Sequence, residues 1–172
     1  MGNIMRGWSL VIQGYGTDYM AQQRQGLMDF KNTGAEHTFS CYLALQAESY
    51  EKIEESEKGL ASIAEAMRLD KKNGIHGYDA ELYRLKGTLL LQQSAGNAEE
   101  AESCCHQAMQ IAREQSAKSW QLRAATSLAR HWQRQGKPDA ASALLAPIFC
   151  WRGASLTAPR AHGFKYVPLA SR

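Results

Sequence analysis

The stretch AELYRLKGTLLLQQSAGNAEEAESCCHQA, residues 80–108, has regularly spaced small and large residues on both sides of a turn. Gly87 stands between Tyr83 and Leu90, each about one helical turn away. Beyond the turn sequence at 94–97, three residues follow steps of four and then three: Ala101, Cys105 and Ala108. Residues at these steps share one helix face. Because a small residue allows close approach of a second helix, the stretch predicts a helical hairpin.

The same pattern recurs about every forty residues along the chain. The small residues of the first helices stand 40, 40 and 42 residues apart: Gly7, Ala47, Gly87 and Ala129. The second helices carry these triplets, of which the first is the poorest: Tyr19, Gln23, Gly26; Gly59, Ile63, Ala66; and Ala141, Leu145, Ile148. A repeat of this length is typical of helical arrays. It predicts four hairpins, in units of about 1–34, 35–74, 77–116 and 117–149.

Turn residues separate the expected helices. Glycine-containing turn sequences stand at these positions: 15–18, 31–34, 71–74, 94–97 and 135–139. Asn97 is expected to cap a helix, and Pro138 to lie in a first helical turn. No alternating pattern of useful length predicts a strand. We therefore expect an all-α fold.

These hairpins resemble the tetratricopeptide repeat (TPR), although the units are six to eight residues longer than its usual 34. The resemblance implies a right-handed superhelix whose concave face is lined by the first helix of each hairpin and binds other proteins. Residues 80–91 and 117–149 are also similar to the C-terminal TPR regions of large bacterial signalling proteins. Those proteins place a nucleotide cyclase or a DNA-binding domain, then an ATPase, before such repeats.

Two classes of function follow from this resemblance. The first is a non-catalytic protein-interaction module, and the second is a separated piece of a cyclase- or ATPase-type enzyme. No motif of either enzyme is present in the chain, so we expect no catalytic residue and no cofactor. The similarity stops at Cys150, and residues 150–172, which contain four bases and no acid, are expected to form an irregular basic tail.

Composition limits the binding partners and the cellular location that we expect for the protein. The 172 residues are 44% hydrophobic and 22% charged, and the net charge is +3. This charge is too small to indicate nucleic-acid binding by itself, and the basic C-terminal third lacks interleaved aromatic residues. No run is long enough for a signal peptide or a membrane span. The four cysteines form no secreted framework, so we expect a reduced, cytoplasmic protein.

The sequence Cys104-Cys105-His106 could be a reactive or metal-binding cluster. Neighbouring residues on a helix point about 100° apart, however, and no ligand stands at a helical spacing from them. Cys105 also occupies the middle of the packing triplet, where cysteine acts as a small apolar residue. We therefore expect structural packing and no bound metal.

The candidate binding residues are those that the repeat register places on the concave face of the last two units: Arg84, Thr88, Arg123, Thr126, Arg130 and Arg134. Glu81, one turn before Arg84, is the acid nearest to these arginines on that face. Apart from Arg84 beside Glu81, the arginines have no acid nearby in the sequence to neutralise them. They are expected to hold an acidic peptide or a chain terminus through partly exposed contacts. The alternative is an exposed basic helix face that only aids solubility.

Overall fold

The computed structural model describes residues 1–153, and within them the backbone is helical, with no β-strand. The all-helical prediction is therefore confirmed for this part of the chain. The helices are α1 (Gly2–Ile12), α2 (Asp18–Asn32), α3 (Phe39–Lys52), α4 (Ser56–Asn73), α5 (Asp79–Gln93), α6 (Ala98–Glu114), α7 (Lys118–Arg134) and α8 (Pro138–Gly153), with a short 3-10 turn, η1 (Ala95–Asn97), before α6.

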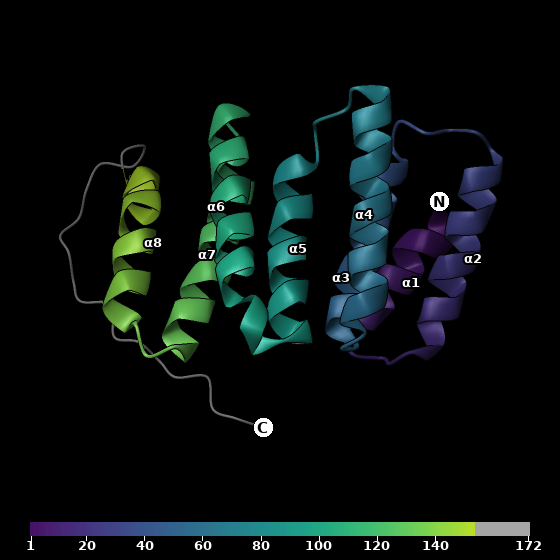
Figure 1. Cartoon of the computed structure of the whole chain (residues 1–172). Helices are drawn as coiled ribbons and strands as arrows, with labels where there is room; N and C mark the ends of the chain where they lie inside the picture. Colours follow the sequence, from purple (N-terminus) through teal and green to yellow (C-terminus); the bar gives the residue numbers. More distant parts are fainter. Residues whose placement is uncertain (154–172) are drawn as a thin grey trace.

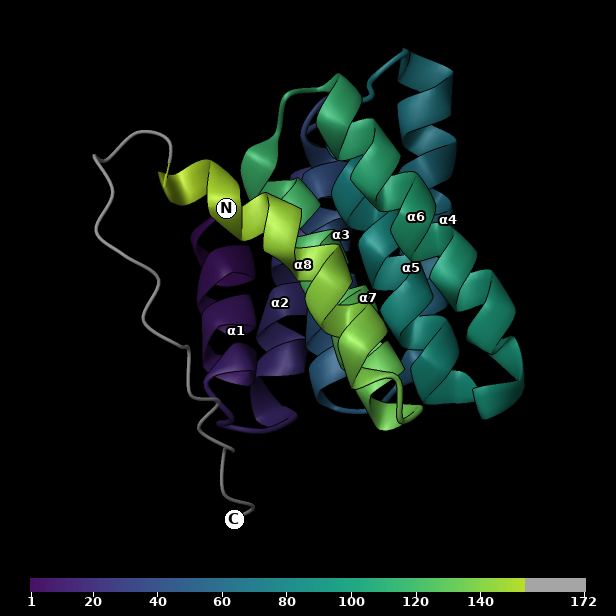
Figure 2. The same ribbon diagram turned by 90° about the vertical axis from the view of Figure 1, so that its left-hand side faces the viewer.

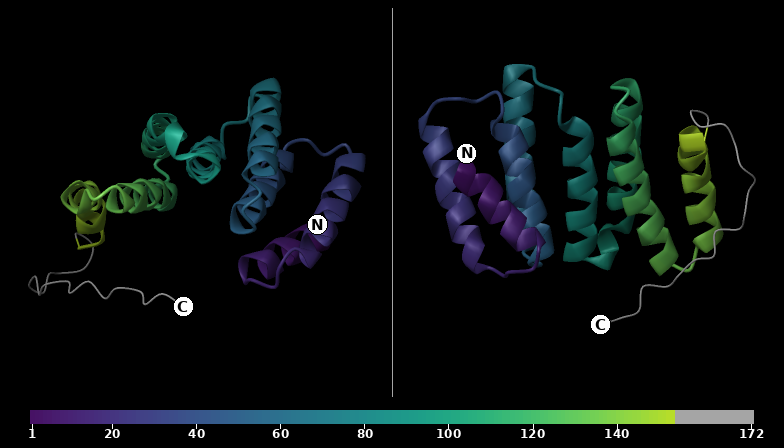
Figure 3. Two further views of the ribbon diagram at one scale, coloured as in Figure 1. Left: turned by 60° about the horizontal axis from the view of Figure 1, so that its bottom comes forward. Right: turned by 180° about the vertical axis from the view of Figure 1, so that it is seen from behind.

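The helices pair in chain order, as Figure 1 shows from α1–α2 on the right to α7–α8 on the left. Each helix packs on the next, and α1, α3, α5 and α7 also pack on one another in succession. Among the described residues the second helices of successive hairpins make no such contacts with each other. The first helices therefore form an inner layer. Seen from the α8 end, the other hairpins lie behind α8 (Figure 2). The view from behind shows α1 and α7 in front (Figure 3).

Small residues let the two helices of a hairpin approach each other. A Cβ atom on Gly87 would lie 2.9 Å from the carbonyl oxygen of Ala101 and 3.2 Å from the sulfur of Cys105. A Cβ atom on Gly7 would lie 2.8 Å from the Cβ of Gln23, so even the poorest predicted triplet packs where the spacing placed it.

Gly59 departs from this pattern. The atoms nearest to its Cβ position, at 2.7 Å, belong to Leu89 of α5 in the next hairpin. The reason is that α4 packs between α3 and α5, and its small residue faces the second of these neighbours. Gly59 therefore serves the contact between hairpins, whereas Ile63 and Ala66 of the same triplet join the core that includes Ala47.

The core runs through the array as connected clusters. The largest cluster joins the first three hairpins, and α5 contributes Leu82, Leu85 and Leu89, each at most 1% exposed. Burying one such side chain stabilises the fold by about 1.5–3 kcal/mol. A second cluster joins α6, α7 and α8 around Leu128. Helix α5 is thus held firmly between its neighbours, which fixes the positions of its polar face.

The helix ends follow the predicted turn residues closely. Gly74 ends α4 in the left-handed conformation, with φ of 64°, which glycine adopts without strain. Pro138 is the first residue of α8, as predicted. Asn97 occupies the N-cap position of α6, but its side-chain amide donates to the Leu90 carbonyl oxygen at 3.2 Å instead of capping.

The last helix is longer than the sequence predicted. Helix α8 continues to Gly153, beyond the expected end of the array at Phe149, and it contains Pro147. No glycine or other turn residue stands between Pro147 and Gly153 to end the helix earlier. The rest of the predicted tail, residues 154–172, lies outside the described part of the chain. Over the residues that are described, no helix has the length and apolar character needed to cross a membrane.

Candidate functional site

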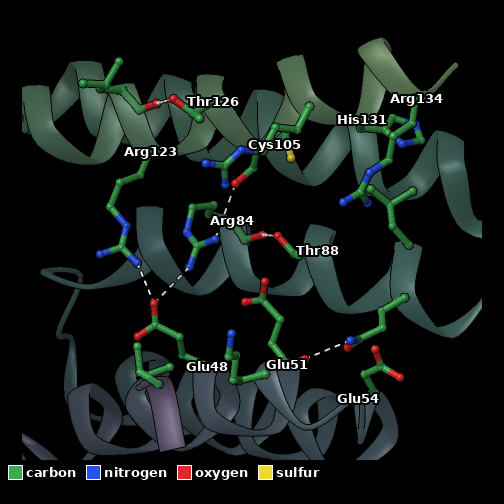
Figure 4. Close-up of a pocket in the computed structure, with 17 residues that line it drawn as sticks. Glu48, Glu51, Glu54, Arg84, Thr88, Cys105, Arg123, Thr126, His131 and Arg134 are labelled. Atoms are coloured by element: carbon green, nitrogen blue, oxygen red, sulfur yellow. Dashed lines mark hydrogen bonds and ion pairs between the residues drawn. The ribbon is translucent and has the colours of Figure 1, made fainter. Parts of the chain in front are cut away.

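A groove with a volume of about 790 Å³ lies along the inner layer. It is lined by residues of α3, α5 and α7 and by Ile12 at the end of α1, with Cys105 of α6 also reaching it. The close-up in Figure 4 shows most of the labelled residues running in the same order along α3, α5 and α7, with Glu54 in the turn after α3 and Cys105 on α6. Glu48, Arg84 and Arg123 mark one end, which we name the closed end, and Glu54 and Arg134 mark the other, which we name the open end.

All six residues predicted from the repeat register line this one groove: Arg84, Thr88, Arg123, Thr126, Arg130 and Arg134. The register therefore placed them on a common face, although their role in binding remains a prediction. Glu81, which was named beside Arg84, accepts hydrogen bonds from it but is not among the lining residues.

The expectation of partly exposed contacts is wrong for Arg84. Its side chain is only 8% exposed and forms a two-pronged ion pair with Glu81, with distances of 3.0 and 2.9 Å. The guanidinium group also donates to the hydroxyl of Ser127 on α7 at 3.4 Å. A buried charge needs such partners because it has left water. Arg84 therefore acts as part of the scaffold.

Arg123 is also paired, through acids that lie far from it in the sequence. Its guanidinium group lies 2.8 Å from carboxylate oxygens of both Glu48 and Glu81. Glu48 in turn accepts a hydrogen bond of 2.9 Å from the indole of Trp8 on α1. Figure 4 shows the Glu48 carboxylate between the guanidinium groups of Arg84 and Arg123. One polar network thus links α1, α3, α5 and α7 at the closed end.

The open end carries charges of both signs that this network does not use. Arg130 and Arg134 are exposed on α7, and neither forms an ion pair with a described residue. Glu51, near the end of α3, and Glu54, in the turn after it, also line the groove without an ion pair to any described side chain. The groove therefore has a basic wall on α7 and a mainly acidic wall at the end of α3 and in the turn after it, where Lys52 is the one base in the lining.

Glu51 is the most unusual of these acids. It is half-buried, and its carboxylate points into the groove toward Thr88 (Figure 4). Burial raises the pKa of the Glu51 carboxyl, Arg84 partly opposes this, and the charges of Glu48 and Glu81 add to the rise. The ionised carboxylate is therefore only partly compensated, by the more distant charges of Arg84 and Arg123, and forms no ion pair with a described side chain.

Two threonines, three apolar side chains and four further polar residues also line the groove; the last group is Lys52, Gln92, Ser127 and His131. The hydroxyls of Thr88 and Thr126 donate to carbonyl oxygens of their own helices, at 3.1 and 2.7 Å. Their oxygens remain able to accept hydrogen bonds. Half-buried apolar side chains add hydrophobic contact area: Ile12, Leu91 and Leu122. The surface can therefore contact a segment that is both polar and apolar.

In the stretch Cys104-Cys105-His106, the two cysteines pack in the protein interior. Cys104 and Cys105 are buried, whereas the neighbouring His106 is exposed, so the three side chains diverge. Burial raises the pKa of Cys105 to about 11. The group is therefore a neutral thiol at neutral pH and a poor nucleophile or metal ligand. No cluster of three potential ligands for a metal is found in the described part of the chain.

Sequence reasoning missed Trp8, Glu48 and Glu51 as residues of this site. A signal for the first two exists, because each directly follows the small residue of its first helix. Thr88 and Arg130 occupy the same position in the later units. Extending the register back to the first two units would have placed Trp8 and Glu48 on the groove face.

Comparison of the chain with models of protein families, with curated proteins and with solved structures gives no match.

Proposed function

We propose that this chain is a non-catalytic interaction module that binds a peptide or protein segment in the groove of its inner layer. The observation that carries the proposal is the groove of about 790 Å³, whose open end presents arginines without ion-pair partners among the described residues. An anionic group of the ligand would lie against Arg130 and Arg134, which are one turn apart and can both reach it.

The wider role rests on the resemblance to TPR arrays. Successive packing of first helices on first helices supports a TPR-like solenoid, in which a right-handed superhelix would place this groove on the concave face. The free thiols of Cys41, Cys104 and Cys105 support a reducing, cytoplasmic setting. We place the chain in a bacterial signalling protein of the cyclase or ATPase type, as its C-terminal binding region.

A random-peptide display library, selected on the wild-type chain, tests the proposal directly. The selected peptides are then measured on a variant in which Arg130→Glu and Arg134→Glu reverse the charge of the basic wall. A variant with Arg24→Glu and Lys31→Glu, two exposed residues of α2 outside the groove lining, makes the same change in net charge elsewhere. Circular dichroism checks that both variants keep the helical fold.

We expect the selected peptides to bind the wild type and the α2 variant alike and to lose at least about tenfold in affinity on the groove variant, since tenfold corresponds to only about 1.4 kcal/mol. Equal binding to all three proteins would place the ligand outside the groove. A library that yields no binding peptide would contradict an interaction module.

A further inference from the structure

The two ends of the groove differ in what balances their charges. At the closed end, Arg123 of α7 reaches across to Glu48 of α3, and the two charges meet at 2.8 Å. At the open end, α7 carries Arg130 and Arg134, whereas Glu51 lies near the end of α3 and Glu54 in the turn after it. No ion pair joins these four residues among the described side chains.

We infer that the ligand of the groove is a mixed-charge segment, with an acidic residue that pairs with Arg130 and Arg134 and a basic residue that pairs with Glu51 and Glu54. This inference rests on the proposed function and names the chemistry of its ligand. The ligand supplies at the open end the counter-charges that Glu48 and Arg123 supply to each other at the closed end. A purely acidic segment would satisfy the basic wall and leave like charges facing Glu51 and Glu54.

Electrostatics favours this chemistry over a ligand of one sign. A like charge placed against an unpaired carboxylate costs free energy, whereas an opposite charge relieves the desolvation of Glu51. The basic residue of the ligand therefore meets a carboxylate that has already lost part of its water on folding. The apolar side chains of Leu91 and Leu122 favour an apolar residue between the two charges.

Helix geometry limits the spacing of the charges in the ligand. Arg130 is seven residues beyond Arg123, which is about 10 Å along α7, and Glu51 is three residues beyond Glu48, about 4.5 Å along α3. An extended chain covers about 10 Å in about three residues. Because these distances run along the helices, a spacer of about three residues with a leucine at its centre is the first design to test.

Four capped synthetic peptides of about ten residues test the inference, because an extended peptide of that length spans the groove. The mixed peptide has an acidic pair and a basic pair on either side of the leucine spacer. In the acid-only and base-only peptides one pair is replaced by glutamine, and in the neutral peptide both pairs are. Blocked termini remove the end charges, and fluorescence polarisation at low and at physiological salt gives the affinities.

We expect the mixed peptide to bind wild type at least about tenfold more tightly than either single-charge peptide, and more weakly as salt rises. Replacing Glu51→Gln and Glu54→Gln should lower its affinity to that of the acid-only peptide. Replacing Arg130→Ala and Arg134→Ala should lower it to that of the base-only peptide. The control, Glu57→Gln with Glu99→Gln, removes two exposed acids outside the groove lining and should change nothing.

The outcomes separate this inference from the proposed function. If the acid-only peptide binds as tightly as the mixed one and still depends on Arg130 and Arg134, the mixed-charge inference is wrong and the groove remains a binding site. If no peptide binds with any dependence on the groove residues, and the library-selected peptides ignore them as well, both proposals fall.

Discussion

The closed and open ends of the groove are built from the same three helices and differ in how their charges are satisfied. At the closed end, buried Arg84 and half-exposed Arg123 are held by Glu48 and Glu81. Two to three turns further along α7, Arg130 and Arg134 have no such partner among the described residues. The difference separates charges that hold the array together from charges that are available to another molecule. Register alone does not make this distinction, since it puts all of them on one face.

The largest expected effect on stability comes from removing the buried arginine at the closed end. Arg84→Ala should destabilise the fold by about 3 kcal/mol, because removing one member of a buried pair leaves the other without its full compensation. The value is set at the lower end of the usual range because Arg123 still contacts Glu81 at 2.8 Å. Urea unfolding followed by circular dichroism measures it.

The double replacement Arg84→Met with Glu81→Leu is the matched control for that experiment. It removes both buried charges and keeps the volume, so its cost should be far smaller than that of Arg84→Ala. If Arg84→Ala lowered the free energy of unfolding by less than about 1 kcal/mol, the buried ion pair at the closed end would contribute no more to stability than an exposed surface pair.

The next effect concerns the helix that supports both ends. Gly87→Leu should destabilise the fold by about 1–3 kcal/mol, because its side chain would overlap the backbone of Ala101 and the side chain of Cys105. Thermal unfolding is the measurement. Gly77→Leu, at a position where a Cβ atom meets nothing within 4 Å, gives the comparison. Equal stability of the two variants would mean that α5 and α6 need no close approach.

A smaller effect is expected from Glu51→Gln at the open end. The pKa of Glu51 is raised in the folded state, so the folded chain binds this proton more tightly than the unfolded chain. The ionised form therefore destabilises the fold at pH values above the raised pKa. The variant should be more stable than wild type at neutral pH.

This advantage of Glu51→Gln should shrink as the pH falls through the raised pKa and disappear below the unfolded value, where the wild-type carboxyl is protonated in both states. Paired urea titrations from neutral to acidic pH follow the difference in free energy of unfolding. The charged groups facing Glu51 are Glu48, Glu81, Arg84 and Arg123, and they are unchanged in the variant. A difference that is constant with pH would contradict an unpaired, partly desolvated carboxylate.

The smallest effect on stability should come from Arg130→Ala with Arg134→Ala. Both side chains are exposed, and neither has an ion-pair partner among the described residues, so the free energy of unfolding should change by no more than about 0.5 kcal/mol. The same urea experiment checks this. A loss above about 1 kcal/mol would assign these arginines to the scaffold, as for Arg84.

The sequence predicted the helices and the seams within hairpins because both depend on local spacing. Gly87, Ala101 and Cys105 share a stripe that can be recognised within thirty residues, and Gly74 and Pro138 mark helix ends by their own backbone chemistry. The face of the groove residues followed from the same register.

The pairing of those residues could not be predicted in the same way. Glu48 is 75 residues from Arg123 and 40 from Trp8, so no local spacing relates them. Their contact depends on how far each hairpin is turned against the next, which is set by packing such as that of Gly59 on Leu89. Sequence reasoning noted the local pair of Glu81 and Arg84 but missed the ion pairs of Arg123, because tertiary geometry decides them.

The ion pair between Glu48 and Arg123 also bears on how the chain unfolds. In a simple repeat array each unit contacts only its neighbours, so that end units fray independently and stability is a sum of adjacent terms. Here α3 is tied to α7 across the whole of the α5–α6 hairpin, and the Trp8 hydrogen bond brings α1 into the same network. Loss of one terminal hairpin removes partners from units that are not its neighbours. We therefore expect the array to unfold more cooperatively than a set of independent repeat units.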